Sequence, residues 1–267
     1  MVSLSPIVRL DDRDTFNAFR VTPVDLVVVR FQDLVSKKTF KLNKTYSDVI
    51  SSGGLHGFLD FHGNILLSLI MKDELIANMG PEKYAAVINA IRPDSFTTID
   101  GETYDGESAI SLREIQRIHA ENKELVPLCS SCRPIGLVKG CTKKQVEYHM
   151  ELLKSLGIGD FVFHVGDFFR KGDPGMIAKA RVLSFMVRQQ ATSLILYGMG
   201  SQKRLQHFSY ADIYVTFTHF VTAMKGRKFV GTNRVKYYGS YHPQIVVDNF
   251  IQIYQNVESL KSQTKLV

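Results

Sequence analysis

The chain has 267 residues, of which 45% are hydrophobic, so it can build one α/β barrel or two smaller domains with sizeable cores. The formal charge of +7 favours an acidic partner, most commonly nucleic acid, although an ordinary basic enzyme fits that charge equally well. Three cysteines, an odd number, indicate a reducing compartment, and no apolar run approaches the ~18 residues of a membrane span, so we expect a cytoplasmic protein with no membrane partner and no signal peptide.

The first hundred residues mix polar segments with short apolar runs. Residues 1–20 are polar and mixed in charge, which predicts a surface lead-in. Apolar runs bounded by turn residues predict strands. The expected strands of this part cover 24–31, 47–51, 58–61 and 95–99. Residues 64–91 are expected to be helical, with Pro81 at a helix start.

The clearest pattern is a strand–helix–strand unit from Ile135 to Gly172. Apolar residues such as Val146 and Met150 recur on one face of its helix at a 3.6-residue period. Thr142 and Gln145 have the spacing of a capping box at the helix start. Because such a unit needs a parallel sheet, we expect functional residues at the carboxyl ends of the strands.

The rest of the chain continues the alternation of helices and strands. A helix is expected over 174–190 and strands over 193–197 and 211–217. About seven or eight strands result, and neither a linker nor a fixed-period repeat divides the chain. We therefore predict an α/β fold, a single (β/α)8 TIM barrel over 1–267, with a basic C-terminal extension and a terminal helix over 225–267. A doubly wound open sheet is the alternative.

Four carboxylates stand at or near the ends of expected strands: Asp60, Asp100, Asp167 and Asp212. In a barrel we expect them to converge on one mouth. Any one of them could instead cap the helix that follows its strand. Together they suit general acid–base chemistry or nucleophilic attack at an anomeric carbon, where a negative group stabilises an oxocarbenium-like transition state.

A zinc site is the other chemistry that the sequence invites. Cys129 and Cys132 form a C-x-x-C pair, with Cys141 and His149 downstream. The interval between Cys132 and Cys141 is short for a zinc motif, and His149 falls on an expected helix. We therefore expect free thiols, no metal and no cofactor.

Five short segments between Ser47 and Gly231 carry a resemblance to a known family. They read FLDFHG at 58–63, SFTTID at 95–100, IGLVKG at 135–140, VG at 165–166 and YGMGS at 197–201. Their order resembles that of the tRNA-guanine transglycosylase superfamily, TIM-barrel enzymes that exchange a guanine base for a 7-deazaguanine. In size the chain is similar to the smaller relatives that modify DNA.

The resemblance implies a role for each segment. Asp60 falls on the aspartate at the catalytic centre, and Lys139 stands where the family has glutamine. The implied base-binding residues are Asp100, Glu102, Lys139, Val165, Gly166, Gly198, Met199 and Gly200.

One segment departs from the family at its most important position. Residues 211–216, ADIYVT, align without a gap on the family's C-D-L-F-D-S, so Asp212 matches the first aspartate and Val215 the second, which is the nucleophile. A valine cannot attack C1′. The family's zinc motif after the barrel is also missing, with only His242 near its end.

Three hypotheses follow. The first is a base-exchange enzyme, active on DNA rather than tRNA, whose nucleophile has moved to Asp212 or Asp167. The second is a non-catalytic nucleic-acid-binding paralogue or accessory subunit, and the third is an unrelated small-molecule barrel enzyme. A basic segment interleaved with aromatic residues supports the first two. Its cations are Lys225, Arg227, Lys228, Arg234 and Lys236. Homo- or hetero-oligomers are compatible with each of the three.

Overall fold

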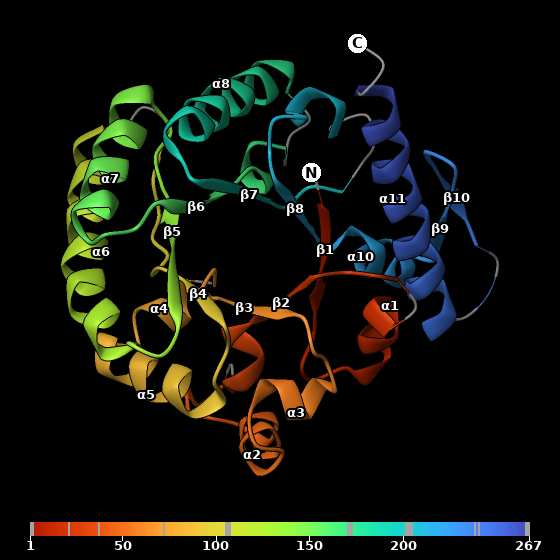
Figure 1. Cartoon of the computed structure of the whole chain (residues 1–267), viewed down its shortest axis with the longest axis horizontal. Coiled ribbons are helices and arrows are strands. Elements are labelled where there is room, and N and C mark those ends of the chain that lie inside the picture. The colour runs from red at the N-terminus through yellow and green to blue at the C-terminus, as the bar shows by residue number, and fades with distance from the viewer. Residues whose placement is uncertain are drawn as a thin grey trace.

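Eight parallel strands close into a barrel in the order of the sequence, and helices surround it (Figure 1). This arrangement is the (β/α)8 TIM barrel that the sequence predicts, and it excludes the open sheet. The computed structural model describes residues 3–20, 22–36, 38–71, 73–104, 108–169, 173–200, 205–237, 239 and 241–264. In that part of the chain, every helix is too short or too polar to cross a membrane.

The barrel strands are short and the helices vary widely in length. The strands are β1 (Ser3–Val8), β2 (Leu26–Arg30), β3 (Asn64–Ser68), β4 (Ser95–Thr97), β5 (Arg133–Val138), β6 (Asp160–His164), β7 (Ser193–Tyr197) and β8 (Ile213–Thr216). The α-helices are α1 (Asn17–Arg20), α2 (Lys44–Ser51), α3 (Leu55–Leu59), α4 (Asp73–Ile76), α5 (Pro81–Ile91), α6 (Ser108–Leu128), α7 (Lys143–Ser155), α8 (Pro174–Gln190), α10 (Thr218–Met224) and α11 (Pro243–Thr264). Single 3-10 turns are η1 (Arg13–Phe16), η2 (Phe31–Leu34), η3 (Gly166–Phe169) and η4 (Gln206–Phe208).

The strands are nearly continuous apolar runs because both of their faces are buried. Alternate residues fill the barrel interior, among them Val28, Leu137 and Val215, and the others pack outward against the helices. Two helix starts follow the expected signals, the first being Pro81, which begins α5. Thr142 and Gln145 form the predicted capping box of α7.

Four local expectations are wrong. Residues 1–20 are not a lead-in, because they contain β1, which pairs with both β2 and β8 and so closes the barrel. Residues 47–51 and 58–61 are not strands, since α2 covers the first segment and α3 ends at the second. Residues 64–91 begin with β3 before any helix. A run of four or five residues with apolar members does not by itself distinguish a strand from a helix turn.

Asp94 ties together neighbouring strands at the amino end of the barrel. Its carboxylate Oδ2 accepts the backbone N–H of Ile65 at 2.7 Å and contacts His56 Nε2 at 3.0 Å. Its own N–H donates to the carbonyl of Ile65 at 3.1 Å. Asp94 thus bonds to both the N–H and the carbonyl of Ile65 in β3.

Asp212 repeats this arrangement four strands later. Its Oδ2 accepts the N–H of Leu194 at 2.8 Å, its Oδ1 lies 3.4 Å from Arg188 Nη2, and its N–H donates to the carbonyl of Leu194 at 3.0 Å. The two aspartates therefore play the same structural part, at the start of β4 and at the start of β8.

We expect Asp94→Asn and Asp212→Asn each to lower the free energy of unfolding by about 1–3 kcal/mol, because each carboxylate accepts a backbone N–H that would lose a charged acceptor. Urea denaturation followed by circular dichroism measures this. Asp60→Asn is the matched control. Asp60 is an exposed residue at the same end with a left-handed φ of 51°, which asparagine adopts readily, so a change within about 0.5 kcal/mol is expected. Equal losses at Asp60 and Asp212 would contradict the assignment.

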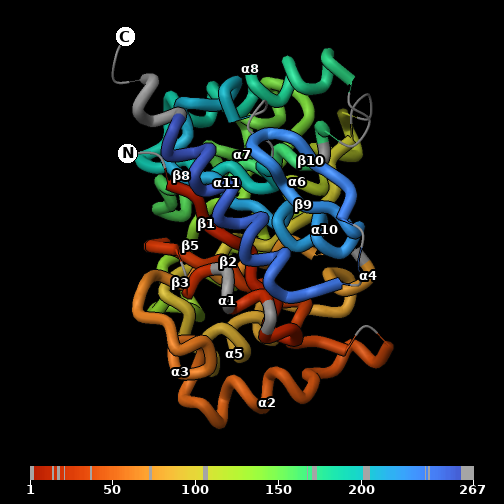
Figure 2. The backbone as a smooth tube through the Cα atoms, turned by 90° about the vertical axis from the view of Figure 1, so that its right-hand side faces the viewer, coloured from red at the N-terminus to blue at the C-terminus, as the bar shows by residue number. Residues whose placement is uncertain are grey.

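The basic segment after the barrel folds as a hairpin of β9 (Arg227–Val230) and β10 (Asn233–Lys236). It lies beside α10 and α11 (Figure 2). The buried side chain of Asn249 on α11 accepts the N–H of Phe229 at 2.7 Å and donates to the carbonyl of Arg227 at 3.3 Å. The amide of Asn249 thereby covers the outer edge of β9 as a neighbouring strand would.

Candidate functional site at the carboxyl end of the barrel

The carboxyl ends of the strands form the mouth at which TIM-barrel enzymes hold their substrates. Three of the predicted base-binding residues lie there together. Asp100 and Glu102 follow β4, and Lys139 follows β5. All three line a cavity of about 340 Å³, with Tyr104, Cys141, His164 and Phe168 among the other walls.

A buried ion pair forms the polar part of this cavity. Lys139 Nζ lies 2.8 Å from Asp100 Oδ1, and the two side chains are only 13% and 9% exposed. Asp100 Oδ1 also accepts the N–H of Gly101 at 2.8 Å. Both contacts fall on Oδ1, and within the described part of the chain no donor reaches Oδ2. The pair therefore offers a carboxylate oxygen and an ammonium group side by side to a ligand.

His149 fixes the backbone beneath this pair. The N–H of Lys139 donates to His149 Nδ1 at 2.9 Å. Burial lowers the pKa of His149 to about 3, so the ring is neutral at physiological pH and its proton is on Nε2. His149, on α7, thus supports the end of β5 and is not among the residues that line the cavity.

Two glycines let the loops after β6 and β7 approach each other. A Cβ on Gly198 would lie 2.8 Å from Gly166 Cα, and a Cβ on Gly166 would lie 2.8 Å from His164 Nε2. These glycines back His164, which lines the cavity. Val165 and Met199 are fully buried, and Gly200 abuts Thr218, so these three support the wall and do not line the cavity.

The residues expected to attack do not join this site. Asp60 caps the end of α3, before β3, and Asp212 precedes β8, so both lie at the amino end of the barrel. The prediction that Asp60, Asp100 and Asp212 converge on one mouth is therefore wrong. The backbone of Asp167 lies in η3 at the carboxyl end of β6, and its side chain is outside what the structure describes.

Val215, at the position of the family's nucleophile, is a core residue. It is fully buried in the barrel interior beside Tyr197. Its carbonyl accepts the N–H groups of Gly198 and Met199, both at 3.1 Å. The valine thus stabilises the turn after β7 and presents no reactive group.

A larger cavity of about 740 Å³ opens at the amino end of the barrel. Asp94 and Asp212 line it, and their carboxylates are engaged with the backbone of the preceding strands. We assign the site to the smaller cavity, because its charged groups face the end of the barrel where TIM-barrel chemistry takes place.

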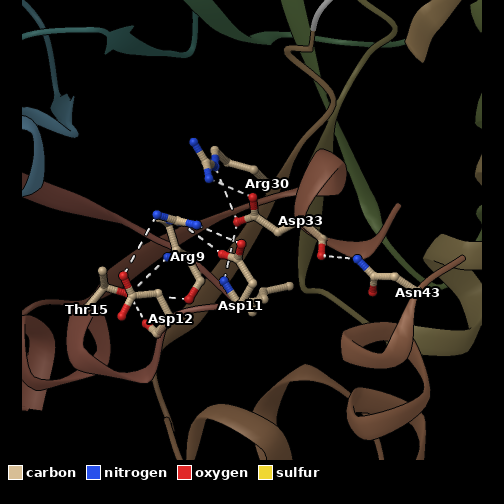
Figure 3. Close-up of polar contacts among 8 residues, drawn as sticks. Arg9, Asp11, Asp12, Thr15, Arg30, Asp33 and Asn43 are labelled. Atoms are coloured by element: carbon tan, nitrogen blue, oxygen red, sulfur yellow. Dashed lines mark hydrogen bonds and ion pairs between the residues drawn. The ribbon is translucent and has the colours of Figure 1, made fainter. Parts of the chain in front are cut away.

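A second charged cluster, absent from the sequence prediction, lies at the ends of β1 and β2 (Figure 3). Arg30 Nη2 lies 2.6 Å from Asp33 Oδ1, and Asp33 Oδ2 accepts the N–H of Leu10 at 3.3 Å. Arg9 pairs with Asp11 through two hydrogen bonds of 2.9 and 2.7 Å. Burial raises the pKa of Asp33, and the charge of Arg30 opposes that shift. The sequence pattern that could have indicated this pair is the i, i+3 spacing of Arg30 and Asp33 at a strand end.

The same arginines stack on aromatic rings that follow β8. Arg30 Cζ lies 4.8 Å from the ring centre of Phe217, and Arg9 Cζ lies 5.2 Å from that of Phe220. The two phenylalanine rings stack 5.0 Å apart. This cluster joins the ends of β1 and β2 to α10, and its arginines are held by carboxylates, so we regard it as structural.

His219 on α10 is a buried histidine whose ring nitrogens have no hydrogen-bond partner among the described residues. Burial lowers its pKa to about 3, below the unfolded value near 6.5. Its contribution to stability is therefore complete above pH 6.5 and is lost as the pH falls toward 3.

Between pH 7 and pH 5 the wild type should lose about 2 kcal/mol of its free energy of unfolding through His219, because only the unfolded state takes up a proton on this ring. His219→Leu should not show this loss, because leucine does not take up a proton. Urea denaturation at both pH values measures this difference. The exposed His207, changed to glutamine, is the control and should leave the pH dependence unchanged. An unchanged pH dependence in His219→Leu would mean that the ring is hydrated in the folded protein.

The cysteines do not gather around a metal. Cys129 and Cys132 are buried before β5, whereas Cys141 lies after β5 at the other end of the strand. Burial raises the pKa of Cys129 to about 11, which keeps it a neutral thiol. Among the described residues, no group of three or more histidine, cysteine or acidic side chains could hold a metal ion.

Fold and site together define a (β/α)8 barrel with a buried carboxylate–ammonium pair in a pocket at the carboxyl ends of β4, β5 and β6. A scan against models of known protein families and a search among curated proteins both found no match.

Proposed function

We propose that the protein binds a guanine or 7-deazaguanine base of a nucleic acid in the Asp100–Lys139 pocket and does not exchange it. This is the second hypothesis from the sequence, a nucleic-acid-binding paralogue or accessory subunit of base-exchange enzymes. The observation that carries it is that the predicted base-binding and catalytic residues lie at different ends of the barrel. Asp100 and Lys139 meet at the mouth, whereas Asp60 and Asp212 lie at the opposite end of the barrel.

The pair is complementary to one edge of guanine. A carboxylate is an acceptor and can take the ring N–H and amino groups, while an ammonium group can donate to O6. Adenine presents a ring nitrogen acceptor where guanine presents a donor, so Asp100 would face a lone pair. A cavity of about 340 Å³ has room for one purine base with its sugar.

Base exchange needs a nucleophile beside the bound base to attack C1′. Val215 cannot supply it, and Asp60 and Asp212 are too far along the barrel. Asp167 follows β6 at the mouth, but its side chain lies outside the described part of the chain. Among the carboxylates described at the mouth, Asp100 and Asp33 are each paired with a cation, and Glu102, which also lines the pocket, has an exposed side chain. These features favour recognition over exchange.

The exposed cations of the hairpin support a nucleic-acid partner. Arg227, Lys228, Arg234 and Lys236 are all exposed, as is Lys225 just before them. Clustered cations on one projection can neutralise phosphates and make the affinity fall with salt.

Isothermal calorimetry with guanine and adenine tests the base-binding part of the proposal. We expect guanine to bind about 10- to 100-fold more tightly than adenine, and Asp100→Asn to remove that preference, because the amide presents a donor as well as an acceptor. Equal binding of the two bases would favour the third hypothesis, a small-molecule barrel enzyme.

Incorporation of radiolabelled guanine into DNA and into tRNA tests the non-exchanging part. We expect no incorporation above a reaction without protein. Incorporation that disappears in Asp100→Asn would instead assign the attack to Asp100 and restore the base-exchange hypothesis.

A further inference from the structure

We propose that the β9–β10 hairpin enters the major groove of duplex DNA and reads base edges there. The inference rests on the proposed function only in its choice of nucleic acid as partner, and it concerns a surface outside the base pocket. It follows from the register of the two strands.

The register assigns each side chain of the hairpin to one of two faces. Paired residues of an antiparallel ribbon share a face, and successive residues alternate. The pairs Arg227–Lys236 and Phe229–Arg234 share the first face. On this face Phe229 packs against the barrel core and lies 5.4 Å from Arg234 Cζ. Phe229 therefore anchors the first face to the body of the protein, and the cations of this face remain exposed around it.

The second face is turned outward. It carries the pairs Lys228–Val235 and Val230–Asn233, and all four side chains are exposed. Val230 is 54% exposed and Val235 is 36% exposed, so two aliphatic side chains lie on this face. Gly231 has a φ of 59°, as the tight two-residue turn of such a hairpin requires, so the tip is narrow.

The chemistry of the outward face matches base edges in the major groove. Asparagine pairs with the N6 and N7 groups of adenine, lysine donates to O6 and N7 of guanine, and aliphatic side chains contact the thymine methyl group. Asn233, Lys228 and the two valines provide one set of these groups within four residues of each strand. A ribbon of that length, about 13 Å, spans about four base pairs.

The charge around this face fits the two walls of the groove. Five cations and no carboxylate occur between positions 225 and 237. Arg227 and Lys236 are exposed at the base of the ribbon, where phosphates border the groove. B-form DNA admits a two-stranded ribbon in its major groove, whereas the major groove of A-form RNA is too deep and narrow to be read by side chains. The geometry therefore favours duplex DNA over RNA.

Fluorescence anisotropy tests this proposal with a 20-base-pair DNA duplex selected from a randomised pool, its RNA counterpart, and the single strand. We expect the DNA duplex to bind at least about tenfold more tightly than the other two. Asn233→Ala should weaken binding to the selected duplex about tenfold and leave binding to unselected DNA unchanged. Lys236→Ala should weaken binding to every duplex and reduce the slope of log K against log salt by about 1.

The experiments distinguish a failure of the groove assignment from a failure of the proposed guanine binding. Tighter binding of the RNA duplex or the single strand, or an equal loss on selected and unselected DNA in Asn233→Ala, would overturn the groove assignment. Thermal unfolding of the hairpin variants should match the wild type, since both residues are exposed. Guanine binding in the pocket should be unaffected by Asn233→Ala. DNA binding without guanine binding would overturn the proposed function and leave the groove assignment in place.

Discussion

Replacing Lys139 with methionine is expected to lower the free energy of unfolding by about 3 kcal/mol at pH 7. The side chains of Lys139 and Asp100 are nearly buried, so removal of the ammonium group leaves a carboxylate without its counter-charge in a poorly solvated place. Urea denaturation followed by circular dichroism measures the loss. Guanine binding should disappear in the same variant, because the donor to O6 is gone.

The double variant Asp100→Asn, Lys139→Met is the control for this prediction. With the carboxylate also neutralised, no unpaired charge remains, and most of the lost stability should return. Losses that simply add in the double variant would show that the two side chains do not act as a buried pair in the folded protein.

Gly198→Ala is expected to lower the free energy of unfolding by about 3 kcal/mol. Two effects combine there. Gly198 has a φ of 90°, which alanine adopts only with strain, and the added Cβ would lie 2.8 Å from Cα and 2.9 Å from N of Gly166. Because those atoms are backbone, the loops after β6 and β7 must separate to make room.

Gly157→Ala is the matched control for Gly198→Ala. Gly157 has a similar φ of 77°, and an added Cβ there meets nothing within 4 Å. Only the backbone strain applies, so we expect a loss of about 1 kcal/mol. Equal losses in the two variants would mean that position 198 requires glycine only for its backbone conformation and not for the close contact between the two loops.

Much of the fold could be predicted because buried parallel strands and amphipathic helices have distinct patterns. The apolar runs at 135–139 and 193–197 gave strands with correct limits to within two residues, and the capping box at Thr142 gave the start of α7. β1 was missed because Ser3 and Ser5 interrupt its apolar pattern, and Ser5 is nonetheless buried. A small polar residue inside a barrel strand weakens the only signal that identifies the strand.

The candidate site was predicted in part, and the error has one physical cause. Asp100 and Lys139 follow strands whose ends are clear, so their convergence could be expected. Asp60 and Asp212 stand one to four residues before a strand. An aspartate before a strand and one after it have similar apolar neighbours, yet they lie at opposite ends of a barrel. Element boundaries, the least certain part of a prediction, therefore decide the site.

The arginine cluster was missed for a related reason. Arg9 belongs to a segment predicted to be a lead-in, so nothing placed it near Arg30. Its contact with Phe220 joins residues more than two hundred positions apart in the chain, and no local pattern reports such a contact.

The central claim is that a guanine base binds between Asp100 and Lys139 at the carboxyl end of the barrel. A crystal structure of the protein grown with guanine tests it most directly. We expect the base in the cavity beside His164, with Asp100 Oδ2 and Lys139 Nζ within hydrogen-bond distance of its edge. A base bound instead in the larger cavity between Asp94 and Asp212 would contradict the account.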